Sequence, residues 1–172
     1  KPIVPVVNRP FLLYQIEVLR RAGITDITLS LSYQPDKIQQ ILGNGSEHGV
    51  TLRYITEPSP MGTAGAYKFA MDGVNETTVV FNGDILANID IAKLVEFHKA
   101  KAAEATISLV RVDDPTRYGL AEADSDGRVV KFVEKPKASE EDMFEINTIN
   151  AGIYILEPAI MDLIQRDTNT SF

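Results

Sequence analysis

The 172-residue sequence contains no cysteine. This absence excludes a disulfide framework, a zinc site built on thiolates and a cysteine nucleophile. No apolar run approaches the ~20 residues of a membrane-spanning helix, and no signal peptide is visible. Basic residues are few relative to acidic ones: 17 Lys and Arg against 24 Asp and Glu give a net charge of −7. This acidic balance argues against a nucleic acid as partner.

The rest of the composition is that of a soluble globular domain, with 44% hydrophobic and 24% charged residues. A chain of 172 residues can bury one sizeable core. We find no internal repeat and no low-complexity segment. These features predict a single domain, residues 1–172, in the cytoplasm, in contact with neither membrane nor nucleic acid.

Residues 1–104 alternate helical and strand patterns. Apolar side chains recur at helical spacing in Phe11–Ala22, and Gly23 is placed to end this helix. Thr63 is the expected N-cap of a later helix. The other predicted elements are the strands Ile27–Leu31, Thr51–Thr56 and Val79–Asn82 and the helices Pro35–Leu42, Thr63–Met71 and Asp90–Lys101. Such alternation favours an α/β fold with a mostly parallel sheet and helices on both faces.

Residues 105–172 are richer in strands, which favours an antiparallel or mixed arrangement. Asp124–Gly127 is a turn between two of the strands. Glu157–Ile164 is a last helix, and the acidic stretch Ala138–Glu145 is a solvated loop. The predicted strands are Thr106–Val112, Leu120–Ala123, Val129–Val133 and Thr148–Leu156.

The first regular element that the sequence predicts is a helix, although a right-handed strand–helix–strand unit needs a strand before it. Lys1–Val7 contains two prolines, which cannot donate to a sheet ladder, so this stretch is not a central strand. We therefore expect the native protein to carry an upstream strand. The end at Phe172 is also abrupt, so the domain is interpreted as truncated at both ends.

Two loops combine features of a ligand crevice. Glu57–Ala66 is rich in proline and glycine and leads into a helix, while the apolar run Thr78–Phe81 ends at Asn82–Asp84. In open α/β sheets, the loops at the carboxyl ends of strands form the ligand site. One loop offers backbone groups at a helix start and the other a carboxylate, a combination that suggests a nucleotide and Mg²⁺.

Six motifs, in order along the chain, resemble the sugar-1-phosphate nucleotidylyltransferases, and in particular their mannose-1-phosphate guanylyltransferase branch. The motifs are Lys1–Val6, Glu57–Gly65, Asn82–Asp84, Tyr118–Gly119, Phe132–Pro136 and Asn150–Tyr154. Two family hallmarks are missing: a Gly-rich phosphate loop with its arginine would precede Lys1, and a second metal-binding aspartate would follow Phe172. The resemblance implies a Rossmann-like nucleotide-diphospho-sugar transferase fold with a nucleotide-binding half, 1–104, and a sugar-binding half, 105–172.

The resemblance implies that a nucleoside triphosphate, with GTP favoured, reacts with a sugar 1-phosphate, with mannose 1-phosphate favoured, and releases pyrophosphate. Mg²⁺ is the implied cofactor, and a homo-oligomer is left open. One alternative is a glucose-1-phosphate enzyme that uses UTP or dTTP. Another is a catalytically silent, pyrophosphorylase-like regulatory subunit, which a degenerate Gly-rich loop upstream of Lys1 would favour.

Three residues are the catalytic candidates. Asp84 follows an apolar strand, and one or two carboxylates plus substrate phosphates typically hold Mg²⁺; the plainer alternative is a turn cap beside Gly83. The resemblance implies that Lys1 contacts the nucleotide phosphates and that Lys135 holds the sugar phosphate. A lysine ammonium there would offset repulsion between the two anions. A solvated surface lysine is the alternative in both cases.

The binding candidates follow from the same resemblance. Glu57 and Gly62 are assigned to the nucleotide, Glu57 because a carboxylate can accept both donors on the Watson–Crick edge of guanine. Glu57 at a strand end, pointing to solvent, is the alternative. The residues assigned to the sugar are Gly119, Glu134, Lys135, Asn150 and Gly152. A turn or bulge glycine, and a surface Glu134–Lys135 pair, remain open, and both histidines, His48 and His98, are expected on the surface.

Overall fold

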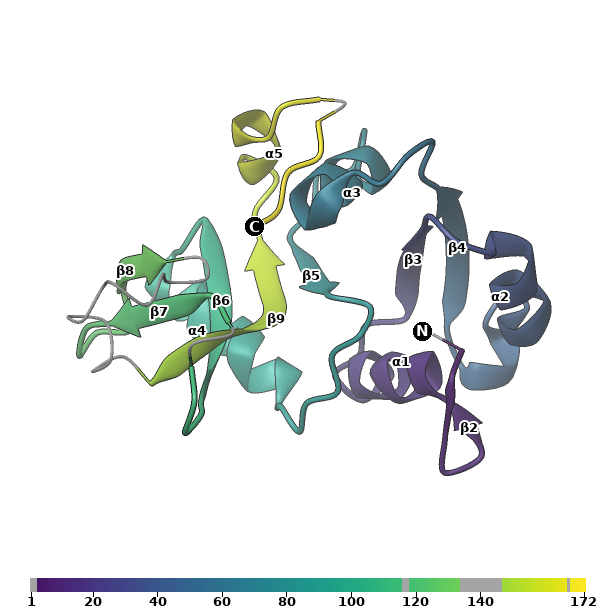
Figure 1. Ribbon diagram of the computed structural model, residues 1–172, viewed down its shortest axis with the longest axis horizontal. Coiled ribbons are helices and arrows are strands. Elements are labelled where there is room, and N and C mark those ends of the chain that lie inside the picture. The colour runs from purple at the N-terminus through teal and green to yellow at the C-terminus, as the bar shows by residue number, and fades with distance from the viewer. Residues whose placement is uncertain (1–2, 116–117, 134–146, 167) are drawn as a thin grey trace. The chain divides into compact units, whose positions relative to one another are not determined.

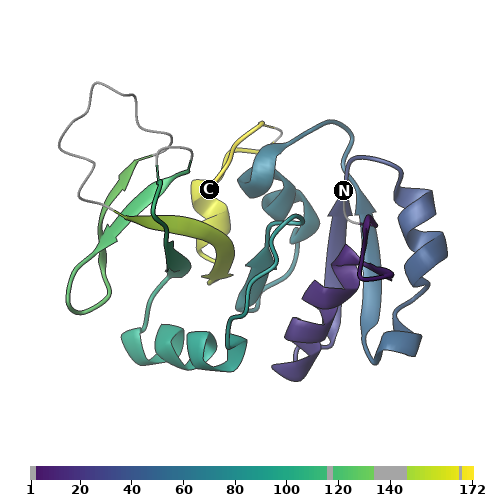
Figure 2. The same ribbon diagram turned by 60° about the horizontal axis from the view of Figure 1, so that its bottom comes forward.

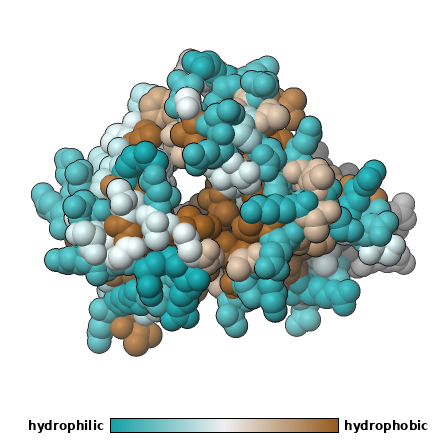
Figure 3. All heavy atoms as spheres, turned by 180° about the vertical axis from the view of Figure 1, so that it is seen from behind, coloured by the Kyte–Doolittle hydropathy of each residue, from teal (hydrophilic) through white to brown (hydrophobic). Residues whose placement is uncertain are grey.

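The structure is a computed structural model that describes residues 3–115, 118–133, 147–166 and 168–172 (Figure 1). It divides into two compact units, the first formed by Lys1–Thr106 with Ile155–Phe172 and the second by Ile107–Tyr154. No helix in the described ranges is long and apolar enough to cross a bilayer. On the face drawn in Figure 3, apolar residues form patches between polar ones.

The first unit begins with a short antiparallel hairpin rather than a central strand. Its strands are β1 (Pro5–Val6) and β2 (Arg9–Pro10), which form a two-stranded sheet of their own. The hydroxyl of Tyr14 donates to the carbonyl of Val6 at 2.7 Å and ties the hairpin to the following helix. The described part of this stretch, residues 3–7, is thus no central strand, as expected from its prolines.

The core of the first unit lies between two helices and a parallel strand pair, whose chain path can be followed in Figure 2. The elements are α1 (Phe11–Arg21), β3 (Asp26–Leu31), α2 (Pro35–Leu42) and β4 (Thr51–Thr56). The register of β3 on β4 runs from Asp26 opposite Thr51 to Leu31 opposite Thr56. Alternate β3 residues, Ile27, Leu29 and Leu31, join the helices in one buried cluster, so the cluster lies on one face of β3.

The remaining elements of the first unit are α3 (Gly62–Ala70), β5 (Thr78–Phe81), α4 (Ile91–Lys101), α5 (Ile160–Leu163) and a 3₁₀ turn, Ser46–His48. The prediction of Thr63 as N-cap is wrong, because Met61 is the N-cap and no side chain caps α3. The last helix begins at Ile160 rather than Glu157. The N–H groups of Ile160 and Met161 donate three residues back, which makes a tight turn there.

The parallel arrangement is confirmed for β3 and β4, but the strands do not all join one sheet. Strand β5 pairs with β9 (Thr148–Leu156), whose last two residues belong to the first unit. In the described ranges, β3 and β4 form a separate two-stranded sheet. The mostly parallel central sheet expected from the sequence is therefore divided in the described ranges.

The second unit is built from strands, as its sequence predicts. Strand β7 (Leu120–Ala123) pairs antiparallel with β8 (Val129–Val133) and with β9, and β6 (Ala105–Arg111) also pairs with β9. A turn at Asp124–Gly127 joins β7 to β8, with the Gly127 N–H donating to the Asp124 carbonyl at 3.0 Å. The stretch Ala138–Glu145 lies outside the described residues.

Candidate functional site

The loop between β4 and α3 is fastened by the carboxylate of Glu57. Its Oε1 accepts from the Ser30 hydroxyl at 3.0 Å, and its Oε2 accepts from the Met61 backbone N–H at 3.4 Å. Ser30 alternates with the buried residues of β3, so it points to the face opposite the α1–α2 core. Glu57 is half-buried, and it therefore does not simply end a strand and point to solvent.

The carboxylate of Glu57 keeps capacity for a further ligand. An ionised carboxylate has about four acceptor positions, and the two contacts described use one on each oxygen. Gly62 lies five residues further on, at the first position of α3, with a φ of +70°. A left-handed backbone of this kind favours glycine. The structure thus brings Glu57 and Gly62, the two nucleotide candidates it describes, to one helix start.

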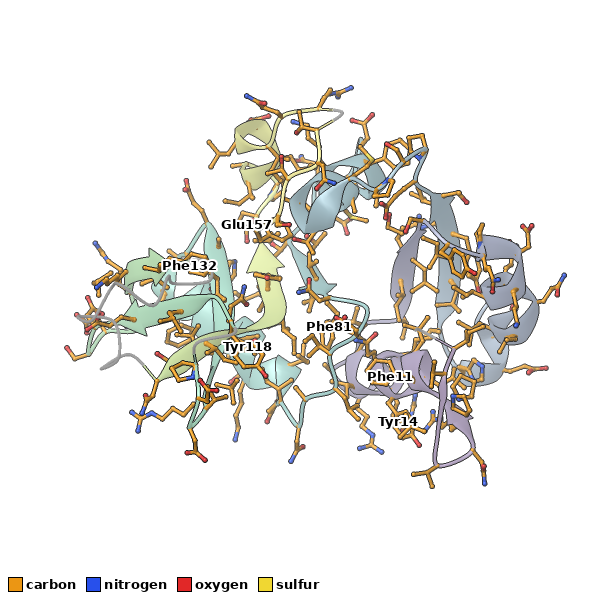
Figure 4. All side chains as sticks on the ribbon, viewed as in Figure 1. Phe11, Tyr14, Phe81, Tyr118, Phe132 and Glu157 are labelled. Atoms are coloured by element: carbon orange, nitrogen blue, oxygen red, sulfur yellow. The ribbon has the colours of Figure 1, made fainter. Side chains whose placement is uncertain are left out.

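Asp84 lies in the turn that follows β5. The Ile85 N–H donates to the Asn82 carbonyl at 3.2 Å, so the turn is closed by backbone. Asp84 is exposed and, with Gly83, lines a cleft of about 230 Å³ whose other walls are Val4, Val6 and Phe11. Figure 4 marks Phe11 at the start of α1 and Phe81 at the end of β5. The carboxylate therefore stands at an accessible hollow beside the carboxyl end of a strand, as the sequence predicts.

The turn that carries Asp84 depends on a residue that sequence reasoning missed. Gln15 of α1 is only 4% exposed, and its Nε2 donates to the carbonyls of Asn82 at 2.9 Å and Ile85 at 2.7 Å. Both amide hydrogens are thereby used to hold the two ends of the turn. The signal was present in the sequence: Gln15 interrupts the apolar stripe of α1, and a polar residue at a buried position needs partners.

Within the described residues, no group of three or more His, Cys, Asp and Glu side chains could hold a metal ion. This finding does not conflict with Mg²⁺, because that ion is usually bound by one or two carboxylates together with substrate phosphates. Asp84, an exposed oxygen donor at a cleft, fits such a role. Soft metals that prefer thiolate find no cysteine in the sequence.

Three of the sugar candidates lie together in the second unit. The Asn150 N–H donates to the Gly119 carbonyl at 2.9 Å, next to the crossing of β7 and β9. The Asn150 Oδ1 accepts from the Gly152 N–H at 2.9 Å, and its Nδ2 donates to the Tyr154 hydroxyl at 2.8 Å. Gly152 has a φ of +70°, which bends β9 in a way that glycine allows. The Asn150 amide therefore has a structural role whatever else it binds.

The remaining candidates, Lys1, Glu134 and Lys135, lie outside the described residues. Their assigned roles stay predictions based on the family resemblance. Tyr118 is described and is 47% exposed. Its N–H donates to the Pro115 carbonyl at 3.1 Å, so it belongs to a turn ahead of β7.

The expectation that His98 lies on the surface is wrong. The imidazole is 2% exposed, with Nδ1 at 2.8 Å from the Thr106 hydroxyl and Nε2 at 3.0 Å from Glu157 Oε1. The hydroxyl of Thr77 donates to the same Oε1 at 2.8 Å. Figure 4 places Glu157 at the end of β9. His98 is seven residues from buried Ile91, which is two helical turns, so both face the interior from α4.

The hydrogen bond from His98, followed by that from Thr77, lowers the pKa of Glu157 from its ordinary value of 4.5. The carboxylate form is therefore the one that the cluster of His98, Thr77 and Glu157 stabilises. The cluster joins α4 to the ends of β5 and β9 and has a structural role in the first unit.

Comparisons with known proteins agree with these features. Residues 1–171 match the family described as Nucleotidyl transferase. The chain is 40% identical over 171 residues to a mannose-1-phosphate guanyltransferase of Saccharomyces cerevisiae, and 37% identical over 172 residues to a mannose-1-phosphate guanylyltransferase of Mycobacterium tuberculosis. These matches cover 96% and 99% of this chain but only 46% of each relative. The chain thus spans less than half the length of the curated relatives it matches.

Solved structures of related proteins show the same fold. HddC from Yersinia pseudotuberculosis superposes with a TM-score of 0.81 at 34% identity, over 99% of this chain and 72% of that one. A putative glucose-1-phosphate thymidylyltransferase from Bacillus anthracis superposes with a TM-score of 0.83 at 27% identity, over 94% of this chain and 64% of that one. The α/β, Rossmann-like fold expected from the sequence is confirmed. The chain belongs to the nucleotidyl transferase family.

Proposed function

We propose that the protein to which this chain belongs transfers GMP from GTP to mannose 1-phosphate, giving GDP-mannose and pyrophosphate. One observation carries the proposal: relatives named for this activity match 96–99% of the chain at 37–40% identity. The activity is inferred for the whole protein, because the chain covers 46% of those relatives. HddC from Yersinia pseudotuberculosis was solved in complex with GMP-PN, which is consistent with a guanine nucleotide in a related fold.

In the proposed reaction, a phosphate oxygen of the sugar phosphate attacks the α-phosphorus of the nucleotide in line. The bond from that phosphorus to the β-phosphate oxygen breaks, and pyrophosphate leaves. Both reactants are anions, so the protein must position them and balance their charge. Asp84 would hold Mg²⁺ together with the nucleotide phosphates, and the ion would neutralise charge on them. Lys1 and Lys135 are proposed to contact the nucleotide and sugar phosphates.

Glu57 and Gly62 are proposed to select the base. Guanine presents two adjacent donors, N1–H and the exocyclic amine, and a carboxylate can accept from both. Uracil and thymine present one donor between two acceptors, which would face the anion unfavourably. The fixed position of Glu57, held by Ser30 and the Met61 N–H, supports this role because a positioned acceptor discriminates better than a mobile one.

Gly119, Asn150, Gly152 and Glu134 are proposed to line the sugar side. Gly119 and Gly152 would let backbone approach the sugar closely. Asn150 keeps one amide hydrogen and one lone pair beyond its contacts with Gly152 and Tyr154. Glu134 would accept from sugar hydroxyls.

The test is a substrate panel on the full-length protein. GTP, UTP, dTTP and ATP are combined with mannose 1-phosphate and glucose 1-phosphate, and pyrophosphate release is measured. We expect the highest kcat/KM with GTP and mannose 1-phosphate. A preference for UTP or dTTP with glucose 1-phosphate would favour the second candidate, which the likeness to the Bacillus anthracis protein supports. Tight binding of a sugar nucleotide without turnover would indicate a silent subunit.

A further inference from the structure

The segment Thr168–Phe172, which we call the C-terminal strap, lies against the start of α3. The Thr170 carbonyl accepts from the N–H groups of Ala64 at 2.9 Å and Gly65 at 3.1 Å, and the Thr170 N–H donates to the Met61 carbonyl at 2.9 Å. The first N–H groups of a helix have no acceptor within the helix. The strap therefore supplies the N-terminal cap that no side chain provides for α3.

The strap also contacts the loop that carries Glu57. Asn169 Nδ2 donates to the Pro60 carbonyl at 3.1 Å, and the Phe172 N–H donates to the Thr63 hydroxyl at 3.0 Å. The Phe172 ring lies 5.8 Å from the Tyr67 ring, centroid to centroid, at an interplanar angle of 56°. Tilted aromatic pairs at this separation are favourable beyond their buried area. The strap is thus attached to the loop and to the helix.

Two glycines of α3 leave room for the strap. A Cβ at Gly62 would come within 2.5 Å of the Thr170 carbonyl oxygen, and a Cβ at Gly65 within 2.5 Å of the Thr168 carbonyl oxygen. Both clashes are with backbone atoms, which cannot turn aside as a flexible side chain would. The packing of the strap thus explains why glycine is needed at both positions, independently of any ligand.

We propose that the C-terminal strap positions the nucleotide-binding loop. By holding the backbone of Pro60 and Met61, the strap fixes the Met61 N–H that in turn orients the Glu57 carboxylate. The inference rests on the proposed function, because it assigns the strap to the same base-binding loop. The strap residues are positioning residues: they act through Glu57 and not on the reacting atoms.

The test compares variants of the full-length protein in the pyrophosphate assay. Asn169→Ala removes the bond to Pro60, and Gly65→Ala displaces Thr168. We expect Asn169→Ala to raise the KM for GTP about fivefold to tenfold, the cost of one lost hydrogen bond, and Gly65→Ala to raise it in the same direction through the clash. For both variants, kcat and the KM for mannose 1-phosphate should stay within about twofold. Phe172→Leu, which keeps apolar contact with Tyr67, should retain more GTP affinity than Phe172→Ala.

Matched controls separate positioning from general damage. Asn75→Ala changes an exposed asparagine of the same unit, and Gly73→Ala adds a Cβ where nothing lies within 4 Å, although φ is +81°. Both controls should leave the two KM values unchanged. A lower melting temperature with unchanged KM for GTP, or equal rises in both KM values, would overturn the positioning role. A wild-type protein that turns over no nucleotide would overturn the proposed function, and the strap's role with it.

Discussion

The start of α3 and the β7–β9 crossing each contain a polar residue that the sequence assigned to substrate, but the two residues are engaged differently. Glu57 makes two contacts and has oxygens with about two acceptor positions left. Asn150 uses its oxygen for Gly152 and one amide hydrogen for Tyr154, inside a strand bent by a glycine. Both side chains thus keep about two hydrogen-bonding positions for a ligand, and they differ in what they hold: Glu57 joins β3 to the loop before α3, whereas Asn150 holds the bend of its own strand.

Among the predicted variants, Asp84→Asn should have the largest effect on activity. It adds Asp84 to the comparison of Glu57 with Asn150. Asparagine keeps the size of the side chain but removes the negative charge that would hold Mg²⁺. We expect kcat to fall about 100-fold or more, as for other losses of transition-state charge stabilisation, with the melting temperature near that of the wild type. The measurement is pyrophosphate release at saturating substrates over a Mg²⁺ titration. Near-normal turnover would show that Asp84 does not hold the metal ion.

Asn150→Ala should sharpen the comparison by showing the scaffold role. The change leaves the buried Gly152 N–H without its acceptor, so the free energy of unfolding should fall by about 1–3 kcal/mol. Urea denaturation followed by fluorescence or circular dichroism measures the loss. Asn75→Ala, at an exposed position, is the control and should change stability by less than about 0.5 kcal/mol. If both variants are equally stable, Asn150 is not part of the scaffold.

Glu57→Gln should show the opposite pattern, a change in specificity with little change in stability. Glutamine can still accept from the Met61 N–H or the Ser30 hydroxyl, so the loop keeps its anchors. The amide would oppose one guanine donor, so we expect the ratio of kcat/KM for GTP to that for UTP to fall about tenfold, close to the value of one hydrogen bond. An unchanged ratio would show that Glu57 does not read the base.

The smallest expected effect is a pH dependence of stability that originates at Glu157, which belongs to neither region. Its pKa is lowered in the folded state, so Glu157 binds a proton more readily when unfolded. Its contribution is therefore present above the ordinary value of 4.5 and is lost as pH falls through the folded-state pKa. Denaturation midpoints between about pH 6 and pH 3 should decline less in Glu157→Gln than in the wild type. Parallel curves would contradict this account.

Local sequence patterns predicted most elements well, because helix and strand periodicity depend on neighbours in the chain. Pro35–Leu42, Thr51–Thr56 and Thr148–Leu156 have the bounds expected from sequence. The Glu57–Gly62 loop and the turn at Asp84 were also identified, since prolines, glycines and an acid after an apolar run are visible without a structure.

The errors share a physical cause, which is a partner far away in the sequence. Thr63 is no N-cap, because α3 already begins at Gly62 and the Thr170 carbonyl, more than 100 residues away, accepts from the first helical N–H groups instead of a side chain. His98 is buried because Glu157, 59 residues away, and Thr106 satisfy its ring nitrogens. Gln15 holds a turn 67 to 70 residues away. A short window of sequence does not include such distant partners, so its periodicity cannot reveal them.

The distance along the chain between the strap and its docking site also has a consequence in time. Ribosomes synthesise roughly 5–20 residues per second, so the chain from Thr63 to Phe172, which are 109 residues apart, takes about 5–20 s to be made. Throughout this interval the N–H groups of Ala64 and Gly65 cannot have their strap acceptor. The nascent chain therefore carries the loop proposed to select the base with an uncapped helix behind it, and that loop acquires its anchor from the strap only once Phe172 has emerged.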